Sequence, residues 1–141
     1  MSKGHDMTID LGRYLQLYFE ENEAYLRILD QQLDAQTNLQ PANEGMRVAI
    51  RAAHSIKGSS GAFGFDEVVK LAQMLELVLR QVERQGTWMG ADQLALCREA
   101  VVVLRQLLVL RRQGGTADTA EVEILSGHLA ECLAEAPVTG V

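Results

Sequence analysis

Apolar residues recur every three or four positions through most of this 141-residue chain. That spacing places them along one face of an α-helix. Proline, which interrupts helices, occurs only at Pro41 and Pro137, between or after the periodic segments. Five such segments can be drawn, over about residues 11–36, 44–59, 66–85, 91–112 and 119–134. The pattern predicts an all-α protein, and the short connections favour a bundle of antiparallel neighbours.

Residue types at the segment ends indicate where the helices begin and end. The first apolar stripe is expected to enter the core from Leu11 onward. Asp66 has a side chain suited to cap the start of the third helix, and Gly86 is suited to end it. We expect residues 1–10 to be a leader, with those before Met7 an addition to the natural start, 11–135 the domain, and 136–141 a linker or tail.

Charge and composition exclude several classes of protein. The net charge of −6 argues against a non-specific nucleic-acid binder, which would present a basic surface. No apolar run approaches the roughly 18–20 residues that span a bilayer, and the N-terminus lacks the apolar core of a signal peptide. Cys97 and Cys132 show no CxxC spacing and lie among helical apolar residues, so buried thiols are expected. We therefore expect a cytoplasmic protein.

One face of the second helix carries a candidate nucleophile. His54 shares this face with Arg51, Lys57 and Gly58, which lie three or four positions away. A neutral imidazole keeps one unprotonated nitrogen that can attack, and Lys57 can neutralise phosphoryl oxygens. Gly58 removes bulk beside the ring, at a cost of about 1 kcal/mol relative to alanine in a helix. A solvated histidine on a basic face, with Gly58 merely near the helix end, is the alternative interpretation.

The third helix offers a carboxylate to this histidine. Glu76 flanks the apolar stripe of that helix instead of facing away from it. A hydrogen bond from one imidazole N–H to Glu76 would fix the tautomer and leave the other nitrogen as the nucleophile. Gln73 lies one turn earlier on the same side and could hydrogen-bond nearby. The alternative for Glu76 is an ordinary surface glutamate.

The run HSIKGSSGAFGF, from His54 to Phe65, resembles the histidine-phosphotransfer (HPt) domain at the N-terminus of the bacterial chemotaxis kinase CheA. The preceding residues 51–53 (RAA) and the acidic residues 19–23 (FEENE) fit the same family. The order and lengths of the five helices agree with it over about residues 11–134. The resemblance implies a five-helix HPt domain built on an antiparallel four-helix bundle.

The resemblance also implies a role for each matching residue. His54 matches the phosphorylated histidine, Lys57 the lysine beside it, and Glu76 the glutamate that hydrogen-bonds the imidazole. Gln73 is a departure, since CheA proteins commonly have a second histidine there. Gly58 lies inside the matching motif, and the small residues Ser59 and Ser60 replace a more usual Gly-Ala pair, with little effect expected.

The function implied is phosphotransfer in two-component chemotaxis signalling. His54 would accept a phosphoryl group from the ATP-binding domain of a CheA-type kinase and donate it to the aspartate of a receiver domain docked over the first two helices. The segment 58–64 is no P-loop, because no Gly-Lys-Ser/Thr follows it. We therefore expect a phosphoryl carrier that is not an enzyme by itself and binds no cofactor, metal, nucleic acid or membrane. ATP and Mg²⁺ would belong to partner domains.

Two other functions remain as alternatives. A pure interaction module would keep the bundle without using a phosphohistidine, although the set of His54, Lys57 and Glu76 argues against it. A metal-binding bundle would need inward glutamates with Glu-x-x-His pairs. None of the three histidines, His5, His54 and His128, has a glutamate three residues before it.

Overall fold

The structure is a computed structural model that describes residues 3–37, 44–86, 89–116 and 118–134. These residues form helices and connecting turns, with no strand among them. The helices are α1 (Lys3–Thr37), α2 (Glu44–Ala62), α3 (Asp66–Gln85), α4 (Ala91–Arg112) and α5 (Thr119–Ala134). The all-α prediction is confirmed.

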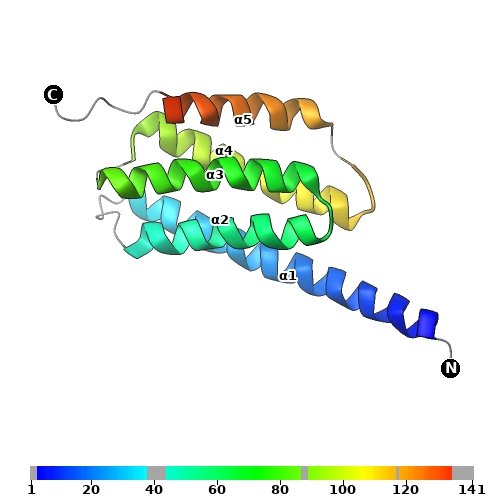
Figure 1. The fold of residues 1–141 in the computed structure, drawn as a ribbon. Helices are drawn as coiled ribbons and strands as arrows, with labels where there is room; N and C mark the ends of the chain where they lie inside the picture. The colour runs from blue at the N-terminus through cyan, green and yellow to red at the C-terminus, as the bar shows by residue number, and fades with distance from the viewer. Residues whose placement is uncertain (1–2, 38–43, 87–88, 117, 135–141) are drawn as a thin grey trace.

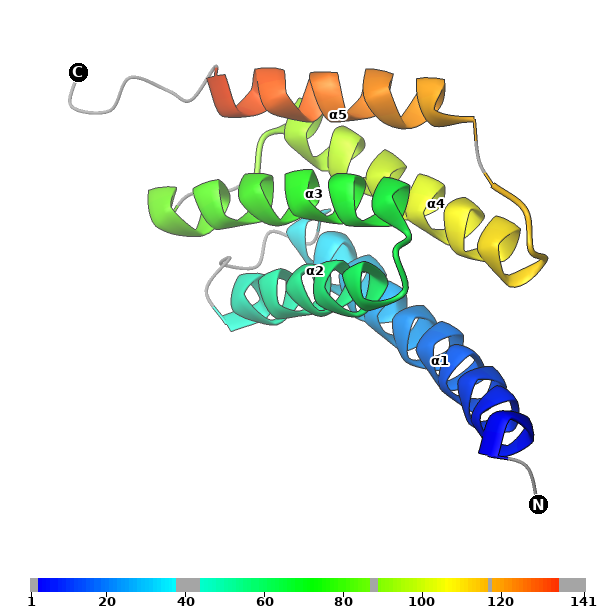
Figure 2. The ribbon, with the colours of Figure 1, turned by 45° about the vertical axis from the view of Figure 1, so that its right-hand side comes forward.

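Four helices form the bundle and the fifth covers one side of it. α1 contacts α2 and α4, and α3 contacts α2, α4 and α5. Both ribbon views place α5 on the far side of α3 and α4 from α1 and α2 (Figures 1 and 2). The N-terminal part of α1 runs beyond the end of the bundle in both views. The two helices that carry the candidate site, α2 and α3, therefore lie side by side at a face that α5 leaves uncovered.

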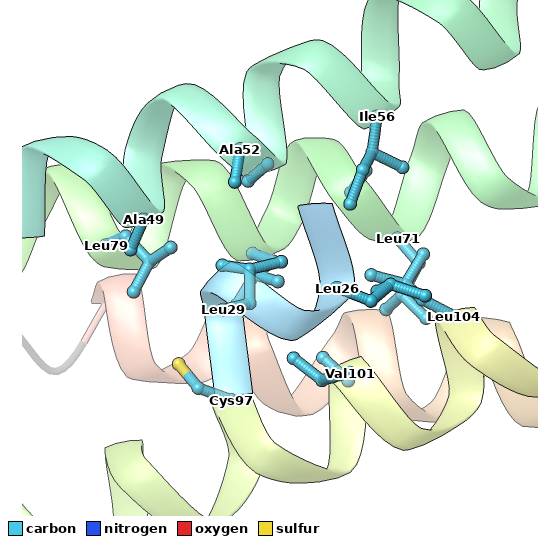
Figure 3. Packing of buried hydrophobic residues seen from close by; sticks show 14 of the residues in the cluster. Leu26, Leu29, Ala49, Ala52, Ile56, Leu71, Leu79, Cys97, Val101 and Leu104 are labelled. Carbon is cyan, nitrogen blue, oxygen red and sulfur yellow. The ribbon is translucent and has the colours of Figure 1, made fainter. Parts of the chain in front are cut away.

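The core lies where the apolar stripes of α1–α4 meet, and buried residues of α5 extend it. Figure 3 shows residues from all four helices around one cluster. Fully buried members include Leu26 and Leu29 of α1, Ile56 of α2, Leu71 of α3 and Leu104 of α4. Complete burial stabilises the fold by about 1.5–3 kcal/mol for a side chain of this size.

The two cysteines differ in burial. Cys97 is in the core, where burial raises the pKa of its thiol to about 12, so it is inert. Cys132 is only partly buried, and neither cysteine forms a disulfide among the described residues. The prediction of buried thiols without a disulfide thus holds fully for Cys97.

Two expectations about helix starts are wrong. α1 begins at Lys3 instead of near Leu11, because no proline interrupts residues 3–10, and Leu11 is exposed instead of buried. The N-cap of α3 is Phe65, with no side-chain cap; Asp66 lies inside the first turn, where its charge favours the positive end of the helix dipole.

Other expected boundaries agree with the structure or lie outside it. Gly86 ends α3 in a left-handed conformation with φ of 64°, as predicted. α2 continues three residues further than expected, to Ala62. Pro41 and Pro137 lie outside the described residues, and the domain boundaries stay a prediction. No helix in the described ranges is both long and apolar enough to cross a membrane.

Candidate functional site

The packing of α2 on α3 positions the histidine. Ala53 and Ile56 face the core and are fully buried, so His54, between them, points outward with 60% of its side chain exposed. On α3, the buried stripe fixes Glu76 at the edge of the interface, where its side chain is only 6% exposed. The site therefore joins an accessible ring to a buried carboxylate.

The imidazole contacts this carboxylate through one nitrogen. Nδ1 of His54 lies 3.2 Å from Oε2 and 3.3 Å from Oε1 of Glu76. In a neutral imidazole the Nδ1–H donates to the carboxylate, which leaves the lone pair on Nε2. The contact expected from the sequence is present.

Two cations share the same carboxylate. Lys57 Nζ lies 3.1 Å from Oε1, and Arg80 reaches Oε2 with Nε at 2.9 Å and Nη2 at 2.8 Å. Burial, the largest influence, raises the pKa of Glu76, but the hydrogen bonds from Lys57, Arg80 and His54 outweigh it and the pKa is lowered. Glu76 is thus an anion that accepts hydrogen bonds and donates none.

Among the described residues, the other predicted site residues make no hydrogen bond to the ring. Gly58 is exposed, and a Cβ built on it would meet nothing within 4 Å, so the space beside the imidazole is open. Gln73 is exposed, and the described contacts include no hydrogen bond from it to His54. Lys57 is bound to Glu76 and 29% exposed.

Arg80 was not among the site residues predicted from the sequence. The available signal was its position four residues after Glu76, a spacing at which helical side chains of opposite charge pair. Many exposed Glu–Arg pairs share that spacing, so only the burial of Glu76 marks this one.

A second group of residues missed in the sequence joins α1 to α2. The hydroxyls of Tyr18 and Ser60 lie 2.6 Å apart, and Asn22 donates to Ser59 Oγ at 3.1 Å. Asn22 and Ser60 are completely buried. These bonds fix the position of α2 against α1, and therefore the position of the helix that carries His54. Ser59 and Ser60 are small, as expected, but they are also hydrogen-bonding residues.

The other end of α3 holds a second buried carboxylate. Glu67 accepts two hydrogen bonds from Arg111 of α4, from Nε at 2.6 Å and Nη2 at 2.7 Å. The guanidinium of Arg111 lies over the ring of Phe65, 4.6 Å from its centroid. The bonds from Arg111 lower the pKa of Glu67. No histidine or thiol takes part, so this pair offers no nucleophile.

Metal ligation finds no support in the described part of the chain. There, no three His, Cys, Asp or Glu side chains gather in a way that could hold a metal ion. The groups that meet at His54 are its imidazole, the Glu76 carboxylate and the cations Lys57 and Arg80.

Comparison with known protein families agrees with a site centred on His54. The model of the Hpt domain family matches residues 13–136. The chain belongs to the Hpt domain family. Chemotaxis protein CheA of Rhizobium meliloti is 32% identical over 140 residues, with 93% of this chain and 18% of the relative covered. The corresponding protein of Salmonella typhimurium is 27% identical over 130 residues, with 92% and 19% covered. This Hpt chain thus spans about a fifth of the length of these relatives.

A solved structure shares the Hpt fold. It is the phosphorylated P1 domain of CheA3 in complex with CheY6 from R. sphaeroides. The TM-score is 0.80 at 21% identity, over 89% of this chain and 98% of that one. The five-helix HPt architecture implied by the sequence motif is confirmed.

Proposed function

We propose that this Hpt domain carries a phosphoryl group on Nε2 of His54. The observation that carries the proposal is the exposed imidazole, bound through Nδ1 to a buried carboxylate of lowered pKa. Because Nδ1 holds the proton, the lone pair of Nε2 is available to a partner approaching from solvent. The roles of the individual residues are part of the proposal.

The transfer has two steps. In the first, the Nε2 lone pair attacks the γ-phosphorus of ATP, the bond from that phosphorus to the bridging oxygen breaks, and ADP leaves. In the second, a carboxylate oxygen of a receiver-domain aspartate attacks the same phosphorus and the P–Nε2 bond breaks. Positioning and charge neutralisation supply most of the catalysis of such transfers. ATP and Mg²⁺ are held by the kinase domain, so this domain is a carrier and not an enzyme by itself.

Each neighbouring residue has one task in this cycle. Glu76 orients the ring, because its carboxylate accepts the hydrogen bond from Nδ1–H in both steps. Lys57, one turn from His54, neutralises phosphoryl oxygens once they arrive. Gly58 leaves room for the partner's active site, and Gln73 has a supporting place at the edge of the site.

The similar proteins support the choice of partners. The relatives are chemotaxis proteins CheA, and the similar P1 domain was solved phosphorylated and in complex with CheY6. By analogy, the donor for this chain is a CheA-type kinase domain, and the acceptor is a response-regulator receiver domain that docks over α1 and α2. The setting is two-component chemotaxis signalling in the cytoplasm.

Radiolabelled ATP and a cognate CheA-type kinase domain test the proposal. The wild type should take up an acid-labile label and pass it to a receiver domain, whereas His54→Gln should take up none. His128→Gln, which removes an exposed histidine on α5, is the matched control and should label like the wild type. Equal acid-labile labelling of His54→Gln and wild type would overturn the assignment.

A further inference from the structure

Arg80 holds the carboxylate of Glu76 from the same helix, α3. Both residues belong to α3, four positions apart, and two N–H groups of the guanidinium reach the same oxygen, Oε2. The other oxygen, Oε1, is left to Lys57 of α2. The two cations therefore bind different oxygens of one anion, and Nδ1 of His54 lies within hydrogen-bond distance of both oxygens.

The two cations differ in what else they can reach. Lys57 lies one helical turn from His54 on the same helix, within range of a phosphoryl group on the ring. Arg80 belongs to the helix of Glu76, and its planar guanidinium is restrained by a hydrogen bond from Nε and an ion-pair contact from Nη2 to a single oxygen. When Lys57 turns to phosphoryl oxygens, Arg80 can remain in place.

Loss of the charge on Glu76 would reverse the ring's tautomer. A protonated carboxyl would donate to Nδ1, and the imidazole proton would then lie on Nε2, the atom that must attack. The titratable and charged groups facing Glu76 are His54 and Lys57 from α2 and Arg80 from α3. With Lys57 engaged elsewhere, Arg80 is the cation that keeps the buried carboxylate ionised.

We propose that Arg80 is a positioning residue for phosphotransfer, which keeps Glu76 ionised and aimed at Nδ1 so that Lys57 is free to contact the phosphoryl group. This inference rests on the proposed function of His54 but concerns a residue that the sequence motif does not contain. It predicts that Arg80 acts through Glu76 and the imidazole, without touching the phosphoryl group.

NMR of the whole chain tests this without a kinase. In Arg80→Gln, the Glu76 carboxyl should titrate at higher pH than in the wild type, and ¹⁵N shifts of His54 should show a smaller share of the Nδ1–H tautomer. Arg80→Lys should restore part of both signals. Arg84→Gln is the matched control, because Arg84 is an exposed arginine one turn further along α3 and outside the contacts of Glu76.

Kinetics supply the second arm. Arg80→Gln should lower the rate of phosphorylation by a kinase domain about tenfold, as for loss of an outer orienting partner, with the acid side of the pH–rate profile moved to higher pH. Arg84→Gln should retain the wild-type profile. An unchanged Glu76 titration and His54 tautomer in Arg80→Gln, or equal rate losses in both variants, would overturn the inference. Absence of label on the wild type would instead refute the function of His54, leaving the NMR result to stand independently.

Discussion

Two buried carboxylates on the same helix do different things in this domain. The side chains of Glu67 and Glu76 are 7% and 6% exposed, each is paired with an arginine, and both have a lowered pKa. At Glu67, Arg111 binds both oxygens and packs on Phe65, and the pair joins α3 to α4. At Glu76, the cations leave room for the exposed ring of His54. Burial and a shifted pKa are therefore shared by a structural site and a candidate reactive site, and the accessible nucleophile distinguishes them.

The largest expected effect is the loss of phosphorylation in Glu76→Gln. The amide cannot match the charge that orients the imidazole, so we expect the rate of phosphorylation of His54 to fall about a hundredfold, at the low end for loss of an oriented acid–base partner. Rapid-quench labelling with a cognate kinase domain measures this rate.

Glu67→Gln is the control for that measurement. It removes a carboxylate of equal burial from the same helix, so its phosphorylation rate per folded molecule should stay within about twofold of the wild type, since no reactive group contacts Glu67. Equal rate losses in the two variants would break the contrast between the two sites.

Arg111→Met should lower the free energy of unfolding and leave the phosphorylation of His54 unchanged. It leaves Glu67 buried without its cation, which costs roughly 3–5 kcal/mol for a completely buried pair. Arg111 is 22% exposed, so water can partly replace it, and we expect the free energy of unfolding to fall by about 2 kcal/mol. Urea denaturation followed by circular dichroism provides the value. A loss of labelling at full stability would assign Arg111 to the reactive site instead.

The pH dependence of folding stability should contain a contribution from each of the two carboxylates, Glu67 and Glu76. Because both pKa values are lowered in the folded protein, each group stabilises it fully above the ordinary value of 4.5, and this contribution disappears as the pH falls through the folded value. Denaturation between pH 6 and pH 2 should give a flatter curve for Glu67→Gln and for Glu76→Gln than for the wild type. A slope unchanged in either variant would show that its carboxyl has the same pKa folded and unfolded.

The smallest expected effect is a gain in stability at Gly58. A Cβ at this position meets nothing within 4 Å, and alanine is preferred to glycine inside a helix, so Gly58→Ala should raise the free energy of unfolding by roughly 0.5–1 kcal/mol. If the open space serves a docked partner, transfer from phosphorylated His54 to a receiver domain should slow in the same variant. Faster or unchanged transfer would remove Gly58 from the site.

The sequence was most informative where a contact is local. Glycine at position 86 ended α3 as expected, because a left-handed cap is a property of a few neighbouring residues. The sequence was misleading at Leu11, which was expected in the buried stripe but is exposed. An apolar stripe indicates which face of a helix can be buried but not where the neighbouring helix ends. Arg80 had a recognisable spacing, but nothing in it revealed the burial of its partner.

Apart from the contact of Glu76 with His54, contacts between distant segments were not predicted. Tyr18 meets Ser60 across 42 positions, and Glu67 meets Arg111 across 44. Neither pair follows a local periodicity, and both depend on the register of one helix against another.

By itself the sequence determined the five helices, the outward face of His54 and the residues able to act beside it, because helical spacing and side-chain chemistry are local properties. The tertiary structure decided that Glu76 reaches Nδ1, that Arg80 and Lys57 divide its two oxygens, and that Glu67 pairs with Arg111 of α4. The physical reason is burial: only the packing of α2 on α3 removes the carboxylate from water and gives its few remaining partners control over its charge and orientation.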